Sequence, residues 1–250
     1  MLKTRNFLAA LMVLALALAA VLIVPRKSVA FTGEDKKSSE KAGVPEALNL
    51  AILIQDDLDS QVANELKVTR EFIRSLPAGS RVMVGYIRSG SLQVRQKFTD
   101  DLEKAANSLR IPVSSDAVSP YNPYVEVIEA LRRFDKEEKS GNRNAILLIS
   151  DGLDVSRGFD STSAGQTLDL QRAIREANRR NVAVYSFYAP SVGLTSHNRI
   201  AVSYGQSSLN RLSDETGGRA FFQGTTGFVS FDSYFDRLRQ TLNDQYARAY

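Results

Sequence analysis

The strongest constraint on the fold is a short apolar run that stops abruptly at an acid. Residues 145–150 read Ala-Ile-Leu-Leu-Ile-Ser without polar alternation, and Asp151 follows directly. Such a run is typical of a strand buried on both faces, which occurs mainly in parallel sheets covered by helices. Residues 48–55 have the same form and lead into Asp56 and Asp57. Because ligands of open α/β sheets bind at the carboxyl ends of the strands, the sequence predicts a site built around these acids.

The first 30 residues have the pattern of an export signal. Lys3 and Arg5 precede an apolar stretch over residues 7–24, and the small residues Ser28 and Ala30 follow it. This order is typical of a secretory signal peptide cleaved after Ala30, which is the preferred interpretation. The stretch is also long enough to cross a bilayer as a retained anchor, so both interpretations stay open. Either one predicts an extracytoplasmic domain, periplasmic or secreted, or held at a membrane through residues 7–24.

The positive net charge of the chain belongs to this export segment. The full chain has 32 basic and 28 acidic residues, and residues 1–30 hold four bases and no acid. The remainder is therefore formally neutral, with 28 of each sign, so we expect no nucleic-acid partner. The absence of cysteine excludes disulfides, thiol catalysis and Cys-ligated zinc.

Strand and helix patterns alternate along the rest of the chain. Residues 31–46 are polar and typical of a flexible linker, and residues 47–250 form one predicted domain. We expect strands at 48–55, 81–87, 92–98, 145–150, 182–188 and 219–222. We expect helices near 62–76, 99–109 (capped by Thr99), 127–134, 170–177, 209–215 and 231–246, with a long loop over 189–205. This order predicts a doubly wound, mostly parallel sheet with one antiparallel edge strand at 92–98 and helices on both faces.

Three short motifs together resemble a known family. They are Asp-Asp-Leu-Asp-Ser at residues 56–60, Ile-Ser-Asp-Gly at 149–152, and Leu-Ser-Asp-Glu-Thr-Gly-Gly-Arg-Ala-Phe at 212–221. In this order and spacing they resemble a von Willebrand factor type A (VWA) domain, closest to the secreted bacterial members, over residues 48–246. The resemblance implies that the first and fourth strands are neighbours. It also implies a protein-binding or adhesion module whose unidentified partner docks over the loops after those two strands.

Many members of that family hold a divalent cation at a site called MIDAS, which is built from D-x-S-x-S, a later threonine and a late aspartate. The resemblance assigns Asp56 and Ser60 to the first loop, Ser119 to the position nearest the threonine, and Asp151 to the late aspartate. Oxygen ligands of this kind suit Mg²⁺ or Mn²⁺ and leave room for a partner's carboxylate. Leu58 stands where the first serine belongs, so the resemblance implies a degenerate site with weak or no metal binding. Alternatively, the two aspartates are structural acids that cap the following loops.

Enzymatic interpretations find little support in the residues. The chain has no Gly-rich nucleotide loop after the first strand and no G-x-S-x-G elbow, and its single histidine, His197, stands alone in the predicted loop at 189–205. We therefore expect a protein that is not an enzyme. The alternative is a metal-assisted hydrolase that uses the same carboxylates. Tyr121 and Tyr124 are predicted either to contact a partner at the rim of the site or to pack the loop.

Overall fold

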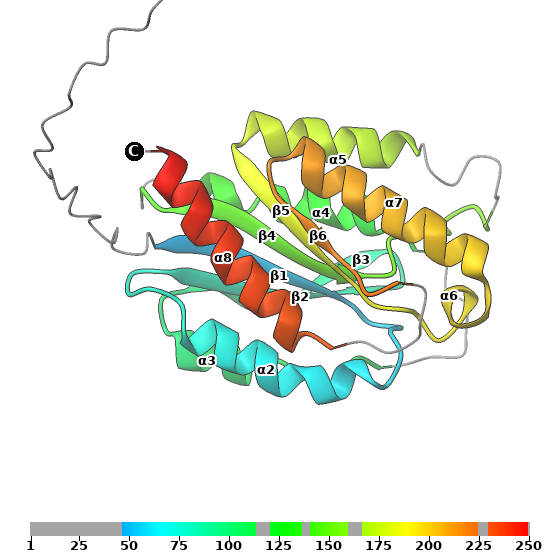
Figure 1. The fold of residues 1–250 in the computed structure, drawn as a ribbon, viewed down its shortest axis with the longest axis horizontal. Helices are drawn as coiled ribbons and strands as arrows, with labels where there is room; N and C mark the ends of the chain where they lie inside the picture. The colour runs from blue at the N-terminus through cyan, green and yellow to red at the C-terminus, as the bar shows by residue number, and fades with distance from the viewer. Residues whose placement is uncertain (1–46, 114–120, 137–140, 160–166, 225–229, 250) are drawn as a thin grey trace, which may run out of the picture. The chain divides into compact units, whose positions relative to one another are not determined.

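The computed structural model describes residues 47–113, 121–136, 141–159, 167–224 and 230–249 (Figure 1). The linker, the export segment and Ser119 lie outside these ranges. Six strands form one sheet in the order β3-β2-β1-β4-β5-β6, and only β2 and β3 pair antiparallel. The strands are β1 Leu48–Gln55, β2 Arg81–Arg88, β3 Ser91–Thr99, β4 Arg143–Ser150, β5 Val182–Tyr188 and β6 Ala220–Phe221. The predicted sheet, with its single antiparallel edge and its neighbouring first and fourth strands, is confirmed.

Helices cover both faces of the sheet. They are α2 Val62–Arg74, α3 Leu102–Asn107, α4 Pro123–Leu131, α5 Leu168–Arg179, α6 Leu194–His197, α7 Arg199–Glu215 and α8 Asp232–Ala249, with a 3₁₀ turn at Phe134–Lys136. Figure 1 shows α2, α3 and α8 on one side of the sheet and α4, α5 and α7 on the other. Two separate apolar clusters fill these two interfaces, so the domain has the three layers that the sequence predicts.

The central strands are buried on both faces, which explains why their sequences do not alternate. In β1, Ile52 and Ile54 pack in the cluster under α2 and α8, whereas Ala51 and Leu53 pack in the cluster under α4 and α5. Burying each large side chain in this way contributes about 1.5–3 kcal/mol. The edge strand β3 alternates instead, with Leu92, Val94 and Phe98 turned inward.

The start of helix α3 differs from the prediction. Its N-cap is Asp101, whose carboxylate accepts a hydrogen bond from the backbone N–H of Lys104 at 2.8 Å. The hydroxyl of Thr99, the predicted cap, instead accepts from the backbone N–H of Asp101 at 3.2 Å. A carboxylate is the stronger acceptor and also interacts favourably with the positive end of the helix dipole, so the helix begins after the acid.

The loop predicted over residues 189–205 is also wrong, because much of it is helical. Helix α6 begins at Leu194, and α7 begins at Arg199, ten residues before the predicted helix start at Leu209. Asn198 caps α7 through its side-chain oxygen. The inner face of α7 carries Gly205 and Ser208, both buried. Small and polar residues on a buried face give no apolar periodicity, so the sequence did not signal this helix.

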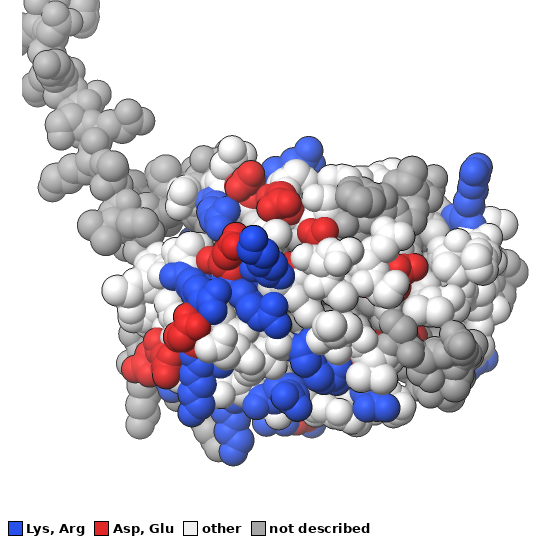
Figure 2. Space-filling model, turned by 90° about the horizontal axis from the view of Figure 1, so that it is seen from below, with Lys and Arg blue, Asp and Glu red and all other residues white. Residues whose placement is uncertain are grey.

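Charged side chains of both signs are mixed on the face that α2 and α3 cover (Figure 2). Arg74 of α2 forms a two-pronged ion pair with Glu103 of α3, with N–O distances of 2.6 and 2.7 Å. Arg239 of α8 similarly pairs with Asp236 at 3.1 Å.

No helix among the residues described is both long and apolar enough to span a membrane. The apolar stretch 7–24 lies outside those residues.

Candidate functional site

One buried carboxamide joins the loops that follow β1 and β4. The two strands pair in parallel, so their carboxyl ends lie side by side. The side-chain carbonyl of Gln55 accepts hydrogen bonds from the Ser150 hydroxyl (2.6 Å) and the Asp151 backbone N–H (3.2 Å). Its amide group donates to the Asp57 carboxylate at 2.7 Å. Gln55 therefore fixes Asp57 and Asp151 relative to one another at this edge of the sheet.

Asp56 is committed to an internal ion pair. Both of its oxygens accept from the guanidinium of Arg110, at 2.6 and 2.9 Å, and the backbone N–H of Val113 donates to it at 2.9 Å. The Arg88 side chain adds a second positive charge at 3.7 Å. The Arg110 guanidinium also lies 3.9 Å above the ring of Tyr86. A bidentate arginine offsets the cost of burying the Asp56 carboxylate, which is only 2% exposed.

Asp57 and Asp151 form the second group of acids, and sequence reasoning missed the role of Asp57. Asp151 is fully buried, and this burial, followed by the negative charge of Asp57, raises the pKa of its carboxyl to about 6. Hydrogen bonds from the Tyr121 hydroxyl (2.6 Å) and the Leu153 backbone N–H (3.0 Å) oppose that shift. Burial likewise raises the pKa of Asp57, against the hydrogen bond from Gln55. The two carboxyl groups thus share a site of low polarity.

Tyr121 and Tyr124 pack beneath this site rather than on its rim. Tyr121 is 7% exposed and donates to Asp151, whereas Tyr124 is 1% exposed and donates to the backbone carbonyl of Gly152 at 2.5 Å. Asn122 caps α4 by accepting from the backbone N–H of Tyr124 at 3.0 Å, which places both rings. Of the two interpretations for these tyrosines, loop packing is confirmed.

The predicted metal ligands differ in their surroundings. Asp56 offers no free carboxylate because Arg110 occupies both of its oxygens. Ser60 is exposed, and Ser119 lies outside the described residues. Leu58 is fully buried in the core and does not face the acids as a missing ligand.

Acids and histidines do not form a larger ligand cluster at this edge. In the part of the chain that the structure describes, no three or more His, Cys, Asp or Glu side chains are placed to hold a metal ion. The motif also uses hydroxyl and water ligands, so binding of Mg²⁺ or Mn²⁺ stays a prediction.

Helix α7 holds the Asp151 loop in place through two glycines. Gly152 has φ +75°, a left-handed conformation, and a Cβ added there would lie 2.4 Å from the carbonyl oxygen of Gly205. A Cβ added to Gly205 would lie 1.9 Å from the carbonyl oxygen of Asp151. The helix and the loop approach this closely only because neither residue has a side chain.

The buried carboxyl of Asp151 predicts a stability that depends on pH. Its folded pKa of about 6 exceeds the unfolded value of about 3.9, so the folded state binds this proton more tightly. The free energy of unfolding should therefore fall by about 3 kcal/mol as pH rises through this interval. Asp151→Asn should remove that component and be the more stable form at pH 8, since the amide oxygen can accept from the Leu153 N–H and the amide NH₂ can donate to the Tyr121 hydroxyl oxygen.

Denaturant unfolding of the parent and of Asp151→Asn, between pH 4 and pH 8, measures this difference. Titrations of groups distant from Asp151 cancel when the two proteins are subtracted, and the difference reports Asp151 together with its neighbour Asp57. Parallel pH profiles would show that Asp151 keeps an ordinary pKa in the folded protein.

Large apolar side chains that reach solvent gather at this same edge. Two lie in the segment bonded to Asp56, three lie in the first turns of α4, α5 and α7, and one directly follows β6. They are Ile111, Val113, Val125, Leu168, Ile200 and Phe222. Leu168 is 68% exposed and Ile111 60%. Within the described ranges no other large apolar residue is exposed in this way.

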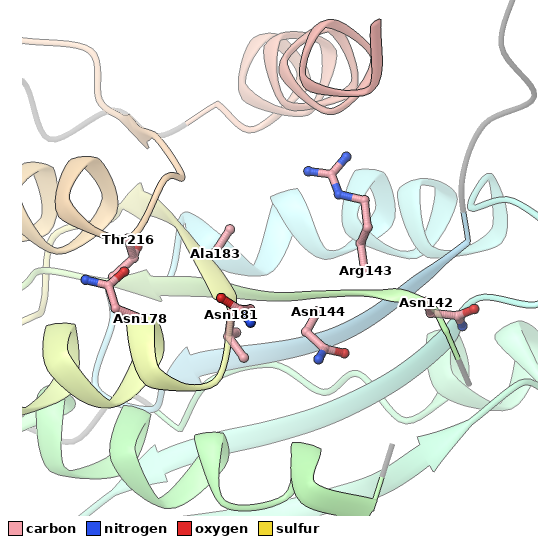
Figure 3. A pocket seen from close by; sticks show the side chains of 8 residues that line it. Asn142, Arg143, Asn144, Asn178, Asn181, Ala183 and Thr216 are labelled. Carbon is pink, nitrogen blue, oxygen red and sulfur yellow. The ribbon is translucent and has the colours of Figure 1, made fainter. Parts of the chain in front are cut away.

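A pocket of about 420 Å³ lies at the opposite edge, where β4 and β5 begin (Figure 3). Its lining includes four asparagines, and Figure 3 shows Arg143 and Asn144 extending to opposite sides of β4. The Asn144 side-chain oxygen accepts from Asn49 of β1 at 2.9 Å, and the Asn178 amide donates to the last carbonyl of α7, that of Glu215, at 2.9 Å. These amides join strand and helix ends, so structural bonding explains their presence.

Comparison with known proteins gives matches only among solved structures; no family model and no curated protein matches the chain. An aerotolerance-related membrane protein from Bacteroides fragilis NCTC 9343 is 14% identical, with TM-score 0.51 over 78% of this chain and 99% of that one. The conserved hypothetical protein BatB from Bacteroides thetaiotaomicron is 14% identical, with TM-score 0.52 over 80% and 99%. A von Willebrand factor type A protein from Catenulispora acidiphila is 15% identical, with TM-score 0.52 over 79% of this chain and 42% of that one. The chain therefore has the fold of a von Willebrand factor type A domain.

Proposed function

We propose that this chain is a protein-binding module whose partner docks over the carboxyl edge of the sheet. The observation that carries the proposal is that all six exposed large apolar residues of the described structure lie at that edge. Covering one such side chain contributes about 1.5–3 kcal/mol when it is fully buried, so a few of them suffice for a specific contact.

We also propose that the module works outside the cytoplasm. The export pattern of residues 1–30 supports this location, with residues 7–24 either removed or retained as an anchor. The similar structure from Bacteroides fragilis is described as that of a membrane protein, which agrees with an envelope location.

The module is proposed to act by binding, without catalysis. The acid that the motif assigns to the end of β1, Asp56, is bound to Arg110 on both oxygens, so a metal-assisted hydrolase would have to rely on Asp57 and Asp151 instead. His197 is exposed at the end of α6, and no acid–base partner for it is found in the described residues.

Site-specific photo-crosslinking in living cells tests the docking face. A photo-reactive amino acid replaces Ile111 or Ile200 at the carboxyl edge and, as controls, Lys67 on α2 or Lys97 on β3. All four positions are exposed, so the folded protein should tolerate each replacement. We expect the same crosslinked protein from positions 111 and 200 and none from positions 67 and 97. Crosslinks that form equally at all four positions, or only at the controls, would contradict the proposal.

A further inference from the structure

The segments that join the elements at the carboxyl edge carry an excess of negative charge. Their described residues lie within 56–61, 108–113, 121–122, 151–159, 189–193 and 222–224. Together these residues hold five aspartates and two arginines, a net charge of −3, although the chain after residue 30 is formally neutral. The aspartates are Asp56, Asp57, Asp59, Asp151 and Asp154, and the arginines are Arg110 and Arg157. Such an edge attracts a positively charged partner.

The carboxylates of Asp57 and Asp151 lie at the centre of this edge without a cation. Arg110 is used by Asp56, and no ion pair to Asp57 or Asp151 occurs in the described parts of the chain. Their hydrogen-bond donors are neutral groups, among them the Gln55 amide and the Tyr121 hydroxyl. Asp57 is only half-buried, so an incoming side chain can reach it.

A buried hydroxyl next to Asp151 also lacks a partner. Tyr188 ends β5 opposite Ser150 and is only 4% exposed, and its hydroxyl makes no hydrogen bond of regular geometry within the described residues. Burial and then the nearby charge of Asp151 raise its pKa, so the phenol stays neutral, although the neighbouring Thr195 hydroxyl partly opposes the shift. An unpaired buried hydroxyl costs about 1–3 kcal/mol, which an N–H donor from a ligand would offset.

A partner's basic side chain suits these groups because they need a positive charge and N–H donors. The described residues contain no cluster of three or more acids or histidines, so carboxylates alone do not complete a shell for Mg²⁺. A guanidinium or ammonium brings a positive charge together with several N–H donors. It can therefore pair with a carboxylate and donate to a neutral oxygen at the same time.

We propose that the partner presents an arginine or lysine, flanked by apolar residues, to Asp57, with the buried charge of Asp151 behind it and without an intervening metal ion. The inference rests on the proposed function, because it names the partner chemistry of the same docking face. The exposed side chains of Ile111 and Val113, in the segment bonded to Asp56, match the apolar flanks. Excluding water around the charge pair strengthens the attraction.

Binding of labelled peptides to the purified full-length chain tests this chemistry. Three peptides share one apolar frame and carry arginine, glutamine or glutamate at the centre, and fluorescence anisotropy reports their affinities. The arginine peptide should bind at least about tenfold more tightly than the glutamine peptide, and its advantage should shrink with added salt. Neither EDTA nor millimolar Mg²⁺ should change this order.

Two variants that each remove one negative charge distinguish a direct contact with Asp57 from a general electrostatic attraction to the carboxyl edge. Asp57→Asn should abolish the preference for arginine. Asp59→Asn should keep most of it, because Asp59 lies two residues away and caps the Gln61 backbone N–H at 2.9 Å, a bond that asparagine retains. Equal affinity for the arginine and glutamine peptides, or equal losses in both variants, would overturn the proposal.

Tighter binding of the glutamate peptide that requires Mg²⁺ or Mn²⁺ would instead establish a contact bridged by a metal ion. That result would also overturn the proposal of a basic side chain. If crosslinks form at Ile111 and Ile200 while the three peptides bind equally, the proposed docking face is supported and the proposed basic side chain of the partner is wrong.

Discussion

Replacing Arg110 with glutamine is expected to lower the free energy of unfolding by about 3 kcal/mol, because the buried carboxylate of Asp56 loses its bidentate partner and keeps only the longer contact with Arg88 at 3.7 Å. Arg110 is 23% exposed and Asp56 3% by side chain, so water can replace the guanidinium only in part. The variant also loses the contact of the guanidinium with the Tyr86 ring. Denaturant unfolding at pH 7 measures the change.

The chain offers a matched control for this prediction. The pair Arg74–Glu103 has the same two-pronged geometry, but its side chains are 42% and 60% exposed, so Arg74→Gln should cost less than about 1 kcal/mol. Adding Asp56→Asn to Arg110→Gln should recover part of the loss, since the unpaired charge is then gone. Similar costs for Arg110→Gln and Arg74→Gln would show that burial does not govern the Asp56 pair.

The sheet could be predicted because burial leaves a direct mark on the sequence. Residues 48–55 and 145–150 are apolar on both faces, and β1 and β4 are indeed the two central strands. The alternating pattern at 92–98 likewise predicted the exposed antiparallel edge. These assignments hold because hydrophobic burial acts locally, residue by residue, along each strand.

The candidate site was predicted only in part, because the sequence does not say which of two adjacent acids faces the partner strand. Asp56 and Asp57 both follow β1, and the family motif favoured Asp56. Asp57 lies in the turn after β1, where strand alternation no longer applies, and only the hydrogen bond from the Gln55 amide shows that it belongs with Asp151.

The partner of Asp56 could not have been found from the sequence either. Arg110 lies 54 residues further along the chain, after a short helix, and no spacing rule connects it with the end of β1. Ion pairs between distant segments depend on tertiary packing, which fixes them only after the sheet and helix α3 have formed. The same limit applies to Tyr188, whose unpaired hydroxyl is a property of its surroundings and leaves no pattern in the sequence.

Replacing Gly205 with alanine is the second substitution with a large expected effect. Whether it raises or lowers the free energy of unfolding is informative by itself. Gly205 lies in the interior of α7, where helix propensity by itself predicts that alanine stabilises the protein by about 1 kcal/mol. The added Cβ would lie 1.9 Å from the Asp151 carbonyl oxygen, a backbone atom that can move only with its loop. We therefore expect a net loss of about 4 kcal/mol in the free energy of unfolding.

Ser207→Ala provides the control, because Ser207 is exposed on the same helix and its replacement should change stability by less than about 0.5 kcal/mol. The loss in Gly205→Ala should also reach the site, since displacing the Asp151 backbone breaks its bond to Gln55. Crosslinking from Ile200, at the start of α7, should then fall in any Gly205→Ala protein that still folds. If thermal unfolding shows Gly205→Ala to be more stable than the parent, α7 can move away from the Asp151 loop without cost. The close contact would then not position the acid.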